Sequence, residues 1–96
     1  MTIHYAIRCE AVRNDGFHTW CIIGDVTAET FIEARDEIIG EAQTLTDSTQ
    51  APYADYASVD ITDPETGFVI GIMAESSGEV TVTEYSPNAE RVLDVP

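Results

Sequence analysis

The sequence predicts one small α+β domain, with its elements in the order ββαβββ. The domain comprises an antiparallel sheet of four or five strands, with one amphipathic helix packed on one face. Three observations support this fold: several segments alternate with period two, one long segment repeats with period 3.6, and glycine-containing turns separate them. A chain of 96 residues is long enough for one domain. We therefore expect residues 1–96 to form a single acidic domain, in which 86–96 is a short edge strand at 92–95 or a loose tail.

A β-hairpin is predicted at the start of the chain. Apolar residues occupy every second position of the first strand, namely Ile3, Tyr5, Ile7, Cys9 and Ala11. Asp15-Gly16 is a strong turn signal because glycine tolerates a positive φ. The returning strand is expected over 17–23, ending at Gly24-Asp25.

The register of this hairpin is left open by the sequence. A two-residue turn at Asp15-Gly16 places Trp20 and Ile22 on the face of Cys9. A three-residue turn instead places Cys9 opposite Cys21. A slip of one residue moves every side chain of a strand to the other face.

The helix is predicted from about 28 to 46. Thr27 is the expected N-cap, because its hydroxyl can accept from first-turn amides. The apolar residues at helical spacing that we expect to face the sheet are Phe31, Ile38, Ala42 and Leu45. Gly40 is expected on the solvent side.

Three further strands are predicted after the helix. They are expected over 53–61, 68–74 and 80–85, with Ala57, Val59 and Ile61 pointing inward in the first of them. A turn over 63–67 should be closed by a left-handed Gly67. The segment 68–74 is the most apolar of the three and is placed centrally.

The charge of the chain is unusual. Eighteen acidic residues oppose four arginines, there is no lysine, and the formal net charge is −14. This excess repels nucleic-acid phosphates and anionic membranes, and it favours basic protein surfaces, cations or water. No apolar run reaches the ~18 residues of a spanning helix, and the N-terminus does not resemble a secretory signal. We therefore expect a cytoplasmic protein whose two cysteines are reduced.

Two groups of carboxylates are the candidate partner-binding residues. The first is an acidic stripe along the predicted helix: Glu29, Glu33, Asp36, Glu37 and Glu41. Residues four apart rise ~6 Å along a helix, a spacing similar to that of backbone phosphates. The second group is Asp60, Asp63 and Glu65, beside Pro64, where a plain turn is the simpler interpretation and weak calcium or magnesium binding the alternative.

Catalytic and metal-binding patterns are not convincing. His18 and Cys21 form an H-x-x-C pattern, with His4 and Cys9 on the neighbouring strand. Residues three apart on a regular strand point to opposite faces, so His18 and Cys21 cannot share a zinc ion or act as a nucleophile–base pair without a bulge. We predict no catalytic residue, no metal and no cofactor.

The aromatic residues add a candidate recognition surface. Four of them fall in or beside predicted strands: Trp20, Tyr53, Tyr56 and Tyr85. If several lie on the sheet face turned away from the helix, they form an aromatic patch with acidic residues at its rim, which is typical of protein-binding surfaces.

Charge is the strongest functional signal in the sequence. We predict a non-catalytic acidic binding or inhibitor protein that docks on a basic surface of a protein partner and can block a DNA- or RNA-binding site as a nucleic-acid mimic. In general composition the chain resembles phage-encoded inhibitors of host defence, although no motif is shared. The alternative is that its acidity serves salt adaptation or solubility only. A small metal-binding or enzymatic domain is the least favoured, and the oligomeric state is open.

Overall fold

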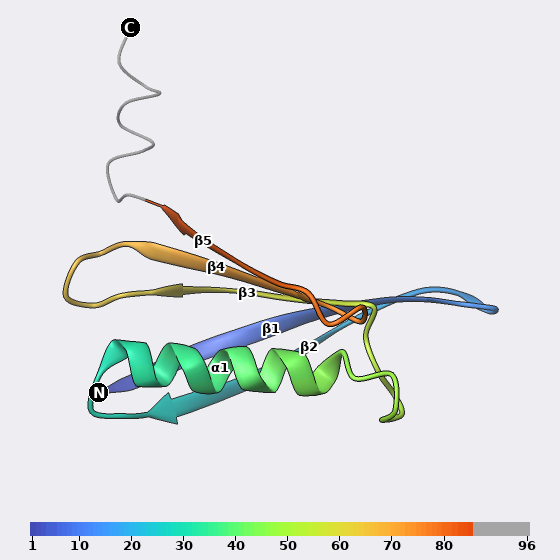
Figure 1. Ribbon diagram of the computed structural model, residues 1–96, viewed down its shortest axis with the longest axis horizontal. Helices are drawn as coiled ribbons and strands as arrows, with labels where there is room; N and C mark the ends of the chain where they lie inside the picture. The colour runs from blue at the N-terminus through green and yellow to red at the C-terminus, as the bar shows by residue number, and fades with distance from the viewer. Residues whose placement is uncertain (86–96) are drawn as a thin grey trace, which may run out of the picture.

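A five-stranded antiparallel sheet carries one helix on one of its faces in the computed structural model, which describes residues 1–85 (Figure 1). The elements are β1 (Thr2–Arg13), β2 (Gly16–Thr27), α1 (Phe31–Leu45), β3 (Tyr56–Thr62), β4 (Val69–Glu75) and β5 (Val80–Tyr85). The strands lie in the order β2-β1-β3-β4-β5, and every neighbouring pair is antiparallel. The predicted fold class and element order are confirmed, whereas the strand expected at 92–95 lies outside the described residues.

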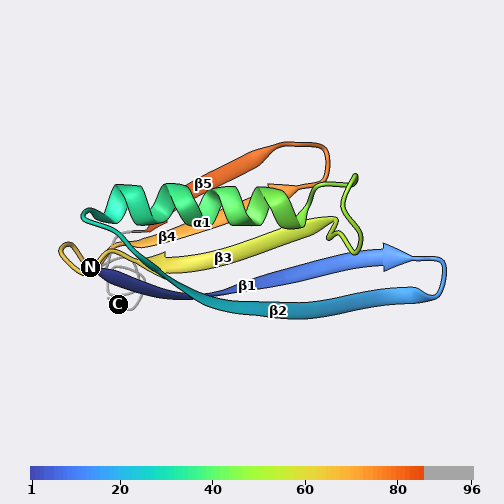
Figure 2. The ribbon, with the colours of Figure 1, turned by 90° about the horizontal axis from the view of Figure 1, so that it is seen from below.

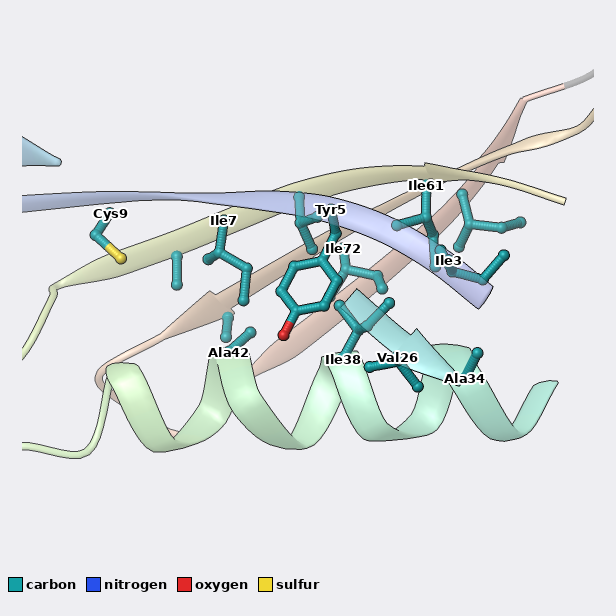
Figure 3. Close-up of a cluster of buried hydrophobic side chains, with 14 of the residues drawn as sticks. Ile3, Tyr5, Ile7, Cys9, Val26, Ala34, Ile38, Ala42, Ile61 and Ile72 are labelled. Atoms are coloured by element: carbon teal, nitrogen blue, oxygen red, sulfur yellow. The ribbon is translucent and has the colours of Figure 1, made fainter. Parts of the chain in front are cut away.

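α1 lies across one face of the sheet (Figure 2), and the hydrophobic core lies between the two. Alternate residues of β1, β3 and β4 point toward the helix and are buried, as their period-two pattern predicts. Ile38 and Ala42 of α1 are fully buried against them, and Phe31 and Leu45 pack at the margin of the core. Figure 3 shows Ile38, Ala42 and Ala34 of α1 facing the inward side chains of the strands.

The hairpin of β1 and β2 places Trp20 on the helix-facing side of the sheet. Cys9 pairs with Trp20 and Ile7 pairs with Ile22, so the three-residue-turn alternative, with Cys9 opposite Cys21, is wrong. The two-residue turn was right in placing Trp20 and Ile22 on the face of Cys9. The turn residues, however, are Asn14 and Asp15 rather than Asp15 and Gly16.

β2 is longer than the sequence predicts. The strand continues through Gly24 to Thr27, which pairs with Thr2, instead of ending at 23. Gly24 pairs with Tyr5, and a Cβ at Gly24 would lie 2.7 Å from the Tyr5 hydroxyl oxygen. This glycine therefore makes room for the tyrosine side chain and does not end the strand.

The helix begins three residues later than predicted. Its N-cap is Thr30, whose side-chain oxygen accepts from the backbone N–H of Glu33 at 3.2 Å. Thr27 is the last residue of β2, and Ala28 is held by backbone hydrogen bonds to Met1 at 2.9 and 2.8 Å. The predicted N-cap was wrong because pairing with the N-terminus keeps Thr27 extended.

The remaining strands follow their predicted pattern, although β3 begins at Tyr56 rather than 53. Gly67 closes the turn after β3 with φ 76°, as expected. β4 is an interior strand between β3 and β5. Within the described residues, no helix is long and apolar enough to cross a membrane.

Pairing between β1 and β3 is short. It covers only three residue pairs, from Arg8–Ser58 to Glu10–Tyr56. Beyond these pairs the two strands diverge, so that β1 and β2 form one arm of the sheet and β3, β4 and β5 form the other (Figure 1). The helix packs against both arms and buries the side chains between them.

Candidate functional site

The acidic stripe of α1 is shorter than the sequence predicts. Glu29 lies before the N-cap Thr30 and is therefore outside the helix. Glu33, Asp36 and Glu37 are exposed on the helix side that faces away from the sheet, where α1 forms the surface of the molecule. Glu33 and Glu37 have no ion-pair partner among the described residues and are available to a partner, whereas Asp36 lies 3.4 Å from Arg35.

Glu41 has a structural role that the sequence does not reveal. The Tyr5 hydroxyl donates a hydrogen bond to its carboxylate, so Glu41 links α1 to β1 and is only half-exposed. Figure 3 shows the Tyr5 ring pointing from β1 toward the helix. Burial raises the pKa of Tyr5 to about 12, and the hydrogen bond to Glu41 and the nearby negative charges add to this increase. The phenol therefore remains a hydrogen-bond donor at neutral pH.

Within residues 1–85, arginine offsets one of the three exposed helix carboxylates, namely Asp36. Each of the three arginines in this range is in contact with a carboxylate: Arg8 with Glu10 at 3.1 Å, Arg13 with Asp55 at 3.2 Å, and Arg35 with Asp36 at 3.4 Å. Arg35 also lies at the half-buried edge of α1. Glu33 and Glu37 have no ion-pair partner among the described residues.

The second predicted group of carboxylates is not joined to the first. Asp60 is on β3 and points to the sheet face turned away from α1, where it lies beside Gly71. Asp63 is used within its turn: its side chain accepts from the backbone N–H of Glu65 at 2.9 Å, and its backbone oxygen accepts from Gly67 at 2.8 Å. Glu65 is exposed at the same turn.

These positions do not assemble a metal site. In residues 1–85 there is no group of three or more histidine, cysteine, aspartate or glutamate side chains that could hold a metal ion. His18 lies on the helix-facing side of β2, and Cys21 lies on the other side. Burial raises the pKa of the Cys9 thiol, which disfavours the thiolate that a nucleophile or a zinc ligand requires.

The sheet face turned away from α1 carries exposed apolar side chains. Six of the nine large exposed hydrophobic residues in the described part of the chain lie on it: Val12, Phe17, Ile23, Tyr56, Met73 and Tyr85. Of the four aromatic residues considered for a recognition patch, Tyr56 and Tyr85 are on this face, Trp20 is on the helix side, and Tyr53 is in the loop before β3. Tyr56 is level with Glu75 at the end of β4 and Tyr85 with Val69 at its start, so the two tyrosines lie at opposite ends of this sheet face and the expected aromatic patch is not formed.

A pocket that the sequence does not predict lies between the hairpin end and the loop before β3. It has a volume of about 390 Å³, and its apolar walls include Trp20, Pro52 and Tyr53. His18 and Asp15 line it and are 2.8 Å apart, a contact that lowers the pKa of Asp15.

The loop beside this pocket is held by Arg13. The guanidinium lies 4.3 Å from the centroid of the Tyr53 ring, contacts Asp55, and donates to the backbone oxygen of Tyr53. Asp55 also accepts from the backbone N–H of Val12 at 2.8 Å, and this hydrogen bond, aided by Arg13, lowers its pKa. These contacts join residues about forty positions apart, so no local pattern in the sequence indicates them.

Comparison with known proteins does not supply a family. No family model, no curated protein and no solved structure matches the chain. The fold and the charged surfaces described above are therefore the basis for a functional proposal.

Proposed function

We propose that this chain is a non-catalytic acidic binding protein that docks on a basic surface of a protein partner, in the manner of an inhibitor that occupies a DNA- or RNA-binding site. One observation carries the proposal. The outward side of α1 presents Glu33, Asp36 and Glu37 to solvent, while Arg35 lies at the half-buried edge of the helix and is already paired with Asp36.

Physical reasoning favours a partner for this surface. Like charges four residues apart in a helix destabilise it by ~0.2–0.5 kcal/mol per pair. Glu33 and Glu37 have this spacing, in a chain whose net charge is −14 and which contains no lysine. A groove adapted to phosphates offers several arginine and lysine side chains, and such complementarity speeds association and selects basic partners. A nucleic acid itself is repelled by the same charge.

The test compares two variants that each remove two negative charges. The first is Glu33→Gln with Glu37→Gln, which leaves Glu41 and its hydrogen bond to Tyr5 in place. The second is Asp60→Asn with Glu65→Gln, on β3 and at the turn that follows it. The binding partners are a panel of purified basic nucleic-acid-binding proteins, with duplex DNA as the competitor.

The expected result is that the parent binds at least one protein of the panel and is displaced by DNA. The helix variant should associate several-fold more slowly at low salt, because the steering charge is reduced. The variant with changes at Asp60 and Glu65 should bind like the parent. If instead this variant alone loses binding, the contact lies around β3. If no protein of the panel binds the parent, the proposal fails.

A further inference from the structure

β2 forms one edge of the sheet, and its outer side has no strand neighbour among residues 1–85. It is 12 residues long, twice the length of β5 at the opposite edge. At about 3.4 Å per residue, such a strand is about 40 Å long. Its outer backbone N–H and C=O groups are therefore available to another strand over most of the length of the molecule.

The usual protection of an edge strand is missing from most of β2, whose one carboxylate is Asp25 near its C-terminal end. Natural sheets discourage edge-to-edge pairing with lysine, proline, bulges or inward-pointing charges. From Gly16 to Gly24, nine consecutive residues, the strand has no acidic residue, arginine, lysine or proline. Two of its large apolar side chains are also strongly exposed, Phe17 at 63% and Ile23 at 83%.

We propose that β2 pairs antiparallel with β2 of a second copy of this chain, forming a symmetric dimer with one continuous sheet. A two-fold axis at Trp20 brings the uncharged segment 16–24 into register with itself and places Asp15 of each copy opposite Asp25 of the other, just beyond the ends of this segment. Phe17 of each copy then lies opposite Ile23 of the other, on the sheet face turned away from α1. Both exposed apolar side chains are covered in this arrangement.

The distribution of charge favours β2 over the other surfaces as the place where a second copy can pair. In a two-fold interface the same surface patch of both copies is in contact, so a patch rich in carboxylates would meet another patch rich in carboxylates. Two molecules with a net charge of −14 repel each other. The outward side of α1 carries Glu33, Asp36 and Glu37, and β5 at the other edge carries Glu84. Between Gly16 and Gly24 the edge of β2 is free of carboxylates, so a second copy meets less repulsion there than at α1 or β5. A basic partner would find no counter-charge on this segment.

The sign of the salt dependence follows from this charge. Salt screens the repulsion between the two acidic molecules, so dimerisation should strengthen as the salt concentration rises. Binding of a basic partner through α1 should weaken under the same conditions. The dimer proposal is therefore independent of the proposed function, and a failure of one is distinguishable from a failure of the other.

The oligomeric state of the full chain tests the proposal. Sedimentation velocity is measured over a range of protein concentrations at low salt and at about 1 M salt, where the screening length is about 3 Å. The key variant is Ile23→Glu, which changes an exposed side chain of β2. The matched control is Ile32→Glu on α1, which adds the same charge at a side chain that is 59% exposed.

We expect a monomer–dimer equilibrium that shifts toward dimer with salt. Ile23→Glu should weaken the dimer about tenfold or more, because two carboxylates are added to one interface. Ile32→Glu should weaken it much less. A monomer at every concentration and salt overturns the proposal, and so does a dimer that Ile23→Glu leaves intact.

Cross-linking provides a second measurement on the unmodified sequence. Cys21 is exposed on β2, whereas Cys9 is buried and fully inaccessible to solvent. In the proposed register the two copies of Cys21 are diagonal neighbours on one face, about 7–8 Å apart. A short bis-maleimide should link them, and Cys21→Ser should abolish the product. Absence of the linked dimer under conditions where sedimentation finds dimer contradicts the β2 pairing.

Discussion

The hydroxyl of Tyr5 on β1 donates a hydrogen bond to the carboxylate of Glu41 on α1, joining the sheet to the helix beside the core. The Tyr5 ring also determines what its neighbour on β2 can be, because a Cβ at Gly24 would lie 2.7 Å from the hydroxyl oxygen. Residues from two other elements, Glu41 of α1 and Gly24 of β2, are thus fitted to the Tyr5 side chain. The strength of this contact is open to direct measurement.

Replacing Tyr5 with phenylalanine removes the hydroxyl group, so the half-buried Glu41 carboxylate loses the hydrogen bond that this hydroxyl donates. We expect the free energy of unfolding to fall by about 1–3 kcal/mol, the typical effect of losing a hydrogen bond to a charged group. Urea denaturation measures the change. Tyr56→Phe on the exposed sheet face is the control, and it should change stability by less than about 0.5 kcal/mol. Equal effects of the two variants would show that the contact with Glu41 is not stabilising.

The raised pKa of Tyr5 predicts a loss of stability in alkaline solution. The pKa is about 12 in the folded protein against 10.0 for an ordinary tyrosine. Between these values the unfolded chain binds fewer protons than the folded one, so stability is intact below pH 10 and falls as the pH rises toward 12. The chain contains no lysine, whose side chain also titrates in this pH range, so fewer groups contribute to the change. Thermal unfolding of the parent and of Tyr5→Phe should show a smaller alkaline loss in the variant.

We expect glycine-to-alanine substitutions at Gly24 and Gly40 to have opposite effects on stability. Gly24→Ala places a Cβ against the Tyr5 hydroxyl, and we expect a loss of about 1–3 kcal/mol through overpacking. Gly40 lies on the exposed side of α1, where an added methyl group would meet no atom within 4 Å beyond the backbone of the helix itself. Gly40→Ala should therefore stabilise the protein by about 1 kcal/mol, the difference in helix propensity. Stabilisation by Gly24→Ala would contradict the close approach to Tyr5.

The N-cap of α1 can be assigned by a second pair of variants. Thr30→Ala removes the side-chain acceptor for the backbone N–H of Glu33 and should cost about 1 kcal/mol. Among residues 1–85, the Thr27 side chain makes one hydrogen bond, an exposed one to the Thr2 hydroxyl at 2.9 Å. Thr27→Ala should therefore have the smaller effect in chemical denaturation. The reverse order would support a helix that begins earlier, as the sequence pattern predicted.

Local patterns were sufficient to predict most of the fold. The alternation in β1 and the helical spacing of Phe31, Ile38, Ala42 and Leu45 each depend on which residues of one element face the core. Their periods follow from the geometry of a single strand or helix. The helix start was misplaced because Thr27 and Thr30 are both good N-cap residues. Only the pairing of Thr27 with Thr2 on the neighbouring strand distinguishes them.

The candidate site was less predictable because its details depend on long-range contacts. The sequence identified the acidic stripe, but it could not show that Glu29 lies outside the helix or that Glu41 is bound by Tyr5. The contact of Arg13 with Asp55 likewise joins residues far apart in the chain. Such contacts depend on how the strands are ordered in the sheet, which residue spacing alone does not reveal.

One salt titration that follows both unfolding and partner binding tests the central claim most directly. If the acidity serves to bind a basic protein, the association rate should fall steeply with salt, and Glu33→Gln with Glu37→Gln should reduce this dependence. Unfolding of the parent measured in the same samples shows how far screening of self-repulsion stabilises the fold. A parent that gains stability steeply up to molar salt and shows no saturable binding to any basic protein at low salt would contradict the account. That result would assign the charge to salt adaptation.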